Sequence, residues 1–264
     1  SDAVNALAIL TAHCDAAHGT SYAKRLEAFR NYLQREDLSI SITMTDTKGD
    51  RSLRPSEQAD PDLYLRRVRR VSGGIVVRGA KAHITTAPYT NEFCVLPTRA
   101  LTEAESDYAV SFAIPANSKG IRIIARSGPW EEGLVDYPVA NRASMVEGLV
   151  IFDDVFVPDE RIFLDGEWRF AGALAGMFAN YHRVTAAAYK YPFAELLVGA
   201  AQLIAECNGI ERVSHVRDKI AWLVMYAESI LALSEAACHQ AKQDSLTGMY
   251  YPDPVIGNAA KFFF

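Results

Sequence analysis

Residues 181–191, YHRVTAAAYKY, carry side chains that could do chemistry. The imidazole of His182 can act as a general acid, a general base or a metal ligand near neutral pH. Arg183 beside it and Lys190 further along can each bind an anion. A single histidine in an apolar helix is nevertheless more often packed than functional. Both interpretations stay open from these residues alone.

A second group of polar side chains lies in residues 45–51, TDTKGDR, directly after the strand-like run SISITM. The candidates for binding a ligand in this loop are Thr45, Asp46, Lys48, Asp50 and Arg51. Aspartate and glycine are also common in solvated turns, because they tolerate turn backbone conformations. The pattern therefore indicates either a binding loop or an ordinary turn.

Two further candidates lie at the ends of strand-like runs. The run KAHITTAP ends in Thr85 and Thr86, whose hydroxyls can donate hydrogen bonds, although threonine is also an ordinary strand former. If this run is a strand, His83 points to the face opposite Ile84 and is either packed or part of a site. Glu147 precedes the apolar run GLVIF. Its carboxyl could act as an acid or a base, or could be an exposed strand start.

The elements that must position these residues change type twice along the chain. Residues 1–36 have helical spacing of apolar side chains. One face of this segment would carry Tyr22, Leu26, Phe29, Tyr32 and Leu33. Residues 37–165 hold short strand-like runs bounded by turn residues, which predicts an antiparallel sandwich or barrel. Residues 166–264 return to apolar stripes at helical spacing, as in a helical bundle. We therefore predict an α+β protein whose central β domain is flanked by helical segments.

The composition limits the class of protein. Half of the 264 residues are apolar and the net charge is −5, which favours a globular protein and argues against nucleic-acid binding. No apolar run approaches 18 residues, so we expect no membrane span. The start SDAVNALAIL lacks a basic region and a cleavage site, so we expect a cytoplasmic protein. The helix-like start and the ending AAKFFF lead us to expect a chain that is incomplete at both ends.

The cysteines and the glycines exclude several kinds of site. The four cysteines are far apart and form no CxxC pair: Cys14, Cys94, Cys207 and Cys238. We expect reduced thiols and no metal site built from these cysteines alone. No GxGxxG or Walker motif occurs, so a Rossmann or P-loop nucleotide site is not supported.

Several longer segments, in order, resemble one superfamily of flavoproteins. They are MTDTKGDRSLRPSEQADPDLYLR, GGIVVRGAKAHITTAPYTNE, DYAVSFAIP and EGLVIFDDVFVPDERIF, and the resemblance runs over almost the whole chain. This superfamily contains the 4-hydroxyphenylacetate 3-hydroxylases and the 4-hydroxybutyryl-CoA dehydratases. The resemblance implies an acyl-CoA-dehydrogenase-like fold, FAD bound between the β domain and the helices, and usually a tetramer. Full members are near twice this length.

The resemblance also implies roles for the candidate residues. The family position that matches Thr85 lies at the flavin, which favours cofactor-binding roles for Thr85, Thr86 and the 45–51 loop. His83 is kept as a further candidate at the cofactor. In the dehydratase branch, the residue that matches Glu147 is a proposed catalytic acid or base.

The resemblance is least complete around His182. The dehydratases have YHR at this place, and there the histidine ligates a [4Fe–4S] cluster together with a cysteine seven residues later. Here that residue is Tyr189, and Ala186 replaces the family's tyrosine, whereas Lys190 matches the family's lysine. A phenol is a poor replacement for a thiolate on such a cluster. We therefore predict no iron–sulfur cluster and no metal.

The hydroxylase branch is also an imperfect match. Those enzymes usually carry a histidine just before the 45–51 loop, whereas SITMTD has none. The first hypothesis is an FAD-dependent, two-component monooxygenase that uses flavin reduced by a partner reductase, with His182 and Arg183 positioning a small aromatic substrate. The second is a lyase or isomerase on a CoA thioester, with Glu147 and His182 exchanging protons and Lys190 supporting charge. The third is a truncated, non-catalytic member of the family.

Overall fold

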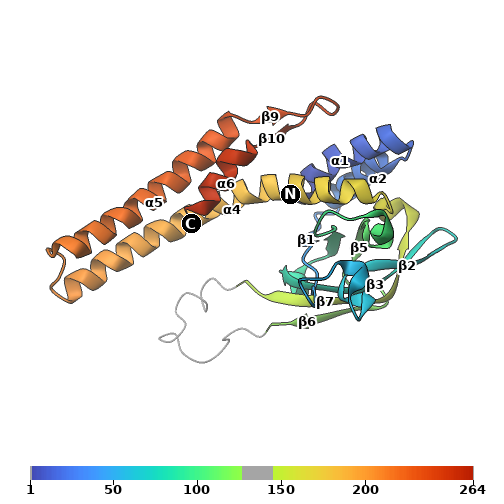
Figure 1. The fold of residues 1–264 in the computed structure, drawn as a ribbon, viewed down its shortest axis with the longest axis horizontal. Coiled ribbons are helices and arrows are strands. Elements are labelled where there is room, and N and C mark those ends of the chain that lie inside the picture. The colour runs from blue at the N-terminus through green and yellow to red at the C-terminus, as the bar shows by residue number, and fades with distance from the viewer. Residues whose placement is uncertain (1, 127–144, 264) are drawn as a thin grey trace. The chain divides into compact units, whose positions relative to one another are not determined.

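The computed structural model describes residues 2–126 and 145–263, which form two compact units (Figure 1). One unit comprises Ala3–Ala175. The other comprises Gly176–Phe264 together with the first two residues. The helices of segment 1–36 belong to the same unit as the strands. The boundary between the units falls inside a long helix, Trp168–Cys207. The three segments expected from the sequence thus form two compact units.

Two helices precede the strands, α1 (Asp2–His18) and α2 (Tyr22–Arg35). In α2 the buried side chains are four of the five expected from the helical spacing: Tyr22, Leu26, Phe29 and Leu33. The carboxylate of Asp15 accepts hydrogen bonds from the backbone N–H groups of Tyr22 at 2.8 Å and Ala23 at 2.9 Å. These bonds satisfy N–H groups that the first turn of a helix leaves without partners. Asp15 therefore fixes where α2 begins.

The strands form two four-stranded sheets. The first has the order β1 (Ile40–Thr43), β4 (Glu92–Val95), β5 (Val110–Pro115) and β8 (Ile162–Asp165). The second has the order β2 (Arg66–Val71), β3 (Gly74–Thr85), β7 (Glu147–Pro158) and β6 (Ile121–Ala125). Short 3-10 helices connect them: η1 (Pro55–Glu57), η2 (Pro61–Leu63), η3 (Ala87–Tyr89), η4 (Glu103–Tyr108) and η5 (Asp159–Arg161). The second sheet is antiparallel, but β1 pairs with β4 in parallel, which the expectation of an antiparallel domain missed.

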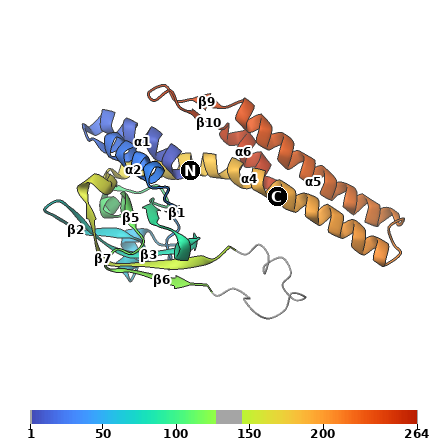
Figure 2. The same ribbon diagram turned by 180° about the vertical axis from the view of Figure 1, so that it is seen from behind.

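The core of this unit lies between the two sheets. The rings of Phe112 on β5 and Phe152 on β7 meet edge to face, with centroids 6.0 Å apart. Val77, Phe93 and Ile162 are fully buried in the same cluster. The described strands of this unit form two separate sheets and no closed barrel. The α+β class is confirmed, and the sandwich is the correct alternative of the two expected; Figure 2 shows the same sheets from behind.

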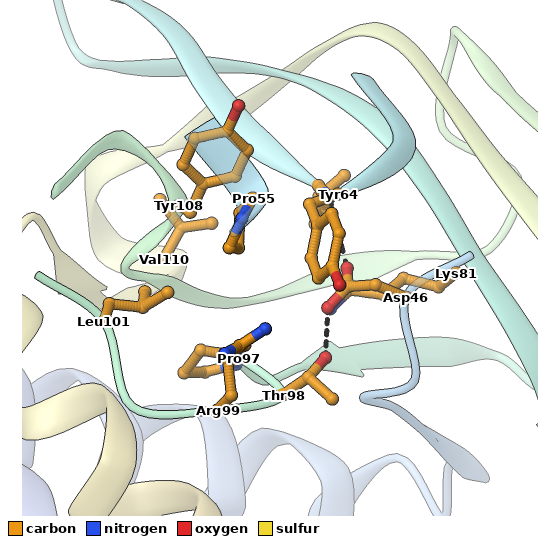
Figure 3. Close-up of a pocket in the computed structure, with 11 residues that line it drawn as sticks. Asp46, Pro55, Tyr64, Lys81, Pro97, Thr98, Arg99, Leu101, Tyr108 and Val110 are labelled. Atoms are coloured by element: carbon orange, nitrogen blue, oxygen red, sulfur yellow. Dashed lines mark hydrogen bonds and ion pairs between the residues drawn. The ribbon is translucent and has the colours of Figure 1, made fainter. Parts of the chain in front are cut away.

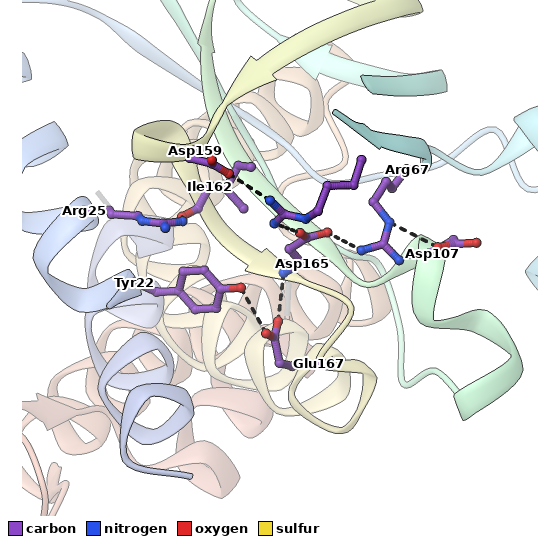
Figure 4. Close-up of polar contacts among 9 residues, drawn as sticks. Tyr22, Arg25, Arg67, Asp107, Asp159, Ile162, Asp165 and Glu167 are labelled. Atoms are coloured by element: carbon purple, nitrogen blue, oxygen red, sulfur yellow. Dashed lines mark hydrogen bonds and ion pairs between the residues drawn. The ribbon is translucent and has the colours of Figure 1, made fainter. Parts of the chain in front are cut away.

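An ion-pair network reinforces the edge of the second sheet at β2 (Figure 4). Arg67 donates to the carboxylates of Asp107 and Asp165, each at 2.6 Å. Glu167 accepts from the hydroxyl of Tyr22 at 3.0 Å and from the backbone N–H of Asp165 at 2.8 Å. The network therefore links α2, β2 and β8. Charged side chains on an edge strand also oppose pairing with a foreign strand.

We expect Gly79→Ala to destabilise the sandwich more than Gly73→Ala. Both glycines have positive φ, +140° and +81°, which costs alanine about 1–2 kcal/mol. An added Cβ at Gly79 would lie 2.6 Å from the Cα of Leu65, whereas Gly73 has no atom within 4 Å. Overpacking of this kind adds about 1–3 kcal/mol. Urea unfolding of both variants measures the difference, and equal losses would contradict it.

The second unit is built mainly from helices. They are α4 (Trp168–Cys207, whose first residues belong to the other unit), α5 (Ser214–His239) and α6 (Pro254–Phe262), with the two-stranded hairpin β9 (Lys242–Gln243) and β10 (Tyr250–Tyr251). Ala187, Ile230 and Ala260 form its buried centre, one from each helix. An added Cβ at Gly257 would lie 2.9 Å from Val184, so α6 approaches α4 closely.

One described helix, α5, meets the length and apolar composition of a membrane span, which the sequence had not led us to expect. Only 22% of that stretch is buried within the structure. Helices of soluble proteins also combine this length with this composition, so the two properties do not by themselves identify a membrane span.

Candidate functional site

A β-bulge in β3 determines which side chains face away from the core. Lys81 pairs with Val150 and Ile84 pairs with Gly148, so Ala82 and His83 together oppose a single residue of β7. His83 takes the left-handed conformation, with φ of 56°. The extra residue shifts the alternation of the strand. As a result Ile84 is buried, whereas the side chain of His83 is 78% exposed.

The bulge opens onto a hollow of about 330 Å³ on β3, β7 and β6. Its lining consists of Ala82, His83, Ile124, Ala125, Arg126, Glu147, Gly148 and Leu149. The floor is mostly apolar and includes two alanines and one glycine, whereas the histidine, the arginine and the glutamate are charged or titratable. His83 Nδ1 lies 4.0 Å from Glu147 Oε2. The structure thus brings together two residues that the sequence singled out separately.

The two threonines at the end of β3 differ in whether their hydroxyls are free to bind a ligand. Thr85 is exposed and pairs with Glu147 across the ladder, so both side chains share the face of the hollow. Thr86 has φ of 61°, and its hydroxyl donates to the Thr85 carbonyl oxygen at 2.7 Å and lies 2.8 Å from Ser41 Oγ. Thr85 is therefore the more available hydroxyl, because that of Thr86 is engaged within the protein.

The first half of the 45–51 loop is anchored by a buried ion pair that sequence reasoning missed (Figure 3). Lys81, only 2% exposed, donates to Asp46 at 2.8 Å, to the Met44 carbonyl at 2.7 Å and to the Leu96 carbonyl at 3.0 Å. Asp46 also accepts from Thr98 and from the backbone N–H of Leu65. Burial lowers the pKa of Lys81, against the attraction of Asp46. Asp46 is thus placed to hold the loop rather than to contact a ligand.

The second half of the loop is a surface turn. The backbone O of Thr45 accepts from Ala82 N at 2.8 Å, which joins the loop to β3. Lys48 has φ of 73°, and Arg51 is exposed. The carboxylate of Asp50 accepts from the backbone N–H and the hydroxyl of Ser52, and these bonds lower the pKa of Asp50. Asp50 and Arg51 are therefore exposed and Lys48 is half-buried, while the base of the turn is fixed.

The helical unit contains the other predicted residues. His182 lies on α4 with half of its side chain exposed, and its ring stacks on Phe178 with centroids 5.1 Å apart and planes 13° apart. Its Nδ1 is 3.2 Å from Asp2 Oδ2, and the other oxygen of Asp2 accepts from Thr185 at 3.1 Å. Chiefly because of the hydrogen bond with His182, the pKa of Asp2 is lowered. Arg183 and Lys190 are partly buried on the same helix.

The surroundings of His182 bear on the expected absence of a cluster. Tyr189, where the family's ligand cysteine would stand, is 49% exposed, and Ala186 is buried. Burial raises the pKa of the thiols of Cys14 and Cys94 to about 12, which disfavours the thiolates that bind iron. Among the described residues, no group of three histidine, cysteine, aspartate or glutamate side chains is arranged to hold a metal. This donor set does not fit a [4Fe–4S] cluster, and the cluster's absence from the protein stays a prediction.

A two-sheet sandwich followed by long helices is the fold of acyl-CoA dehydrogenases. The structure of butyryl-CoA dehydrogenase from Megasphaera elsdenii superimposes with a TM-score of 0.60 at 19% identity, over 97% of this chain and 61% of that one. At this identity the likeness defines the fold alone.

Sequence comparison assigns the family. Residues 1–164 match the N-terminal part of the 4-hydroxyphenylacetate 3-hydroxylases, and residues 171–264 match their C-terminal part. The chain belongs to the 4-hydroxyphenylacetate 3-hydroxylase family, as its motifs indicated. It spans about half the length of the relatives it matches.

Relatives from both branches of the family are similar to this chain. The 4-hydroxybutyryl-CoA dehydratase/vinylacetyl-CoA-Δ-isomerase of Clostridium aminobutyricum is 40% identical over 98% of this chain and 54% of its own length. The oxygenase component of 4-hydroxyphenylacetate 3-monooxygenase from Thermus thermophilus is 33% identical over 88% of this chain and 48% of its own.

Solved structures from the same two branches of the family are also similar to this chain. An oxygen-tolerant archaeal 4-hydroxybutyryl-CoA dehydratase from N. maritimus has a TM-score of 0.91 and 39% identity, over 99% of this chain and 53% of that one. The oxygenase component of a 4-hydroxyphenylacetate 3-monooxygenase, complexed with FAD, has a TM-score of 0.85 and 30% identity, over 98% of this chain and 54% of that one.

Proposed function

We propose that this chain is the flavin-holding part of an FAD-dependent oxidoreductase of the two-component monooxygenase type. The observation that carries the proposal is the hollow on β3, β7 and β6, where an apolar floor is edged by His83, Arg126 and Glu147, and Thr85 pairs with Glu147 beside it. A planar, partly apolar ring system with polar edges fits such a surface. The FAD complex of a relative 30% identical to this chain supports the choice of cofactor.

The residues of the sandwich would bind and orient the cofactor. Thr85 and His83 would hydrogen-bond its polar edge, and Arg126 would attract an anionic group. The accessible turn would supply Lys48, Asp50 and Arg51, while Thr45, Asp46 and Thr86 would keep the strand ends in place. When bound, FAD would supply the redox chemistry with O2, which no side chain of this protein can perform.

The remaining candidates would handle the substrate. Glu147, about one-third exposed at the hollow, would take up or release a proton at its carboxylate oxygen. His182 would accept a proton from the substrate at Nε2, and Arg183 and Lys190 would hold an anionic part of it. A phenol with an acidic side chain has the groups that such residues recognise. We further propose a cytoplasmic homotetramer supplied with reduced flavin by a separate reductase, with no nucleic-acid or membrane partner.

A second candidate function is that of a lyase or isomerase on a CoA thioester. The 40% identity to a 4-hydroxybutyryl-CoA dehydratase and the retained His182 and Lys190 favour it. Against it stand Tyr189 and Ala186 at two positions of the family's motif. If the complete protein carries two cysteines spaced by three residues upstream of this chain, the dehydratase hypothesis gains strength.

We expect Ala125→Trp to weaken FAD binding by an order of magnitude or more, because an indole would fill the exposed hollow without entering the core. FAD fluorescence titration measures the effect on the full chain. Ala59→Trp, at an exposed position outside the hollow, is the control and should bind like the wild type. Equal affinity in both variants would contradict the assignment of the hollow.

Activity assays separate the candidate functions. The monooxygenase hypothesis predicts a yellow protein that hydroxylates a phenol only when a reductase and O2 are present. Turnover of a 4-hydroxyacyl-CoA without a reductase, together with brown colour, iron and sulfide, would instead establish the dehydratase. A chain that binds no FAD even at excess would indicate the non-catalytic family member.

A further inference from the structure

The ring of His182 is held from two sides by residues of its own unit. Phe178, one helical turn earlier, stacks on the ring face, and Asp2 contacts Nδ1 at 3.2 Å. Both carboxylate oxygens of Asp2 are engaged, because the second accepts from Thr185, which lies about one turn after His182 on α4. The imidazole therefore has a fixed plane and a fixed partner.

A carboxylate at Nδ1 determines where the imidazole proton resides. A carboxylate accepts hydrogen bonds and donates none, so neutral His182 must carry its proton on Nδ1 to make this contact. The lone pair is then on Nε2, which has no hydrogen-bond partner among the described residues. The same arrangement orients catalytic histidines in other proteins through a carboxylate behind the ring.

We propose that Asp2 is a positioning residue for His182, holding the Nδ1–H tautomer so that Nε2 can accept a proton from bound substrate. This rests on the proposed function, which gives His182 its role. The proton would move from a substrate O–H to Nε2, giving an imidazolium whose Nδ1–H remains donated to Asp2. No electron transfer is needed in this step.

A purely structural role for Asp2 predicts a different outcome. Asp2 also accepts a hydrogen bond from the Thr185 hydroxyl, a contact that stabilises this unit without any part in chemistry. If that were its only role, removing the carboxylate would change stability but neither the tautomer of His182 nor turnover. The two roles are thus separable by measurement.

The test is the tautomer of His182, read from long-range ¹H–¹⁵N spectra of the histidine rings of the full chain. The His182→Ala variant assigns the signal among the six histidines. We expect the Nδ1–H tautomer in the wild type and in Asp2→Glu, and a shift toward the Nε2–H tautomer in Asp2→Ala. Unchanged spectra in Asp2→Ala would overturn the proposal.

Turnover gives the second readout. We expect Asp2→Ala to lower kcat/KM by about 10- to 100-fold, as loss of such an orienting partner does elsewhere, with FAD affinity unchanged. Glu195→Gln, which removes a carboxylate that accepts from Tyr191 on the same helix, is the matched control and should have neither effect. A changed tautomer with no loss of any activity would refute the role of His182 in the proposed function, whereas an unchanged tautomer refutes the role of Asp2.

Discussion

Lys81→Met should lower the free energy of unfolding by about 3–5 kcal/mol, because it would leave the carboxylate of Asp46 buried without its cation. Methionine matches the length of the lysine stem and is apolar, so the cavity term is small. The loss would also release the carbonyls of Met44 and Leu96, which both accept from Nζ. Urea unfolding followed by circular dichroism measures the change.

A double variant separates the ion pair from the packing at this position. The pKa of Lys81 is lowered because the cost of burying its charge exceeds the attraction of Asp46. Replacing both partners, in Lys81→Met with Asp46→Leu, should therefore recover a large part of the stability. If the double variant is as unstable as the single one, Lys81 stabilises the fold through contacts other than its ion pair with Asp46.

Removing Lys81 should also affect the binding of FAD. The lysine connects β3, the loop after β1 and the end of β4, so its removal frees the base of the 45–51 loop. We expect the double variant to be folded but to bind FAD more weakly than the wild type. This outcome would show that the ion pair between Lys81 and Asp46 orders the 45–51 loop and adds little to the free energy of unfolding.

Glu147→Gln should lower kcat by about 10²- to 10⁴-fold, the range typical of a lost general acid or base. Glutamine keeps the shape of the side chain but cannot exchange a proton. The variant should fold normally, since the side chain is 36% exposed at the hollow and its backbone pairing with Thr85 is retained. Turnover at saturating FAD and substrate measures the effect.

The matched control for Glu147 lies on the same strand. Asp153 on β7 is exposed and pairs with Arg122 at 3.2 Å, outside the lining of the hollow. Asp153→Asn should retain wild-type kcat. If Glu147→Gln turns over like Asp153→Asn, Glu147 is an exposed strand residue and the acid–base role passes to His182 alone.

Because the chain is similar to both branches of the family, these substitutions bear on the difference between the monooxygenases and the dehydratases. The hollow lies on the strands β3, β7 and β6, and the sequence runs of β3 and β7 are among those that carry the family resemblance. The substitutions that separate this chain from the dehydratase pattern, Tyr189 and Ala186, lie instead on α4. Substitutions in the hollow therefore test flavin binding, whereas substitutions at Tyr189 and Ala186 on α4 test which of the two reactions the protein catalyses.

The elements of the fold were largely predictable from the sequence. The helical spacing of Tyr22, Leu26 and Phe29 predicted the buried face of α2, because the period of an apolar pattern is a local property. The β-branched run around Ile75 likewise predicted a strand. The parallel pairing of β1 with β4 was missed, because strands forty residues or more apart in the chain choose their partners through tertiary packing.

The sequence by itself determined the elements, the family and which side chains were candidates for chemistry. The tertiary structure decided which of these candidates are exposed and which are buried in contacts within the protein. Asp46, a candidate for binding a ligand, is buried in an ion pair with Lys81, whereas His83 is exposed at a bulge. The partner of His182 is Asp2, 180 positions away. Such contacts depend on the folding of distant segments onto one another, which no local pattern of residues encodes.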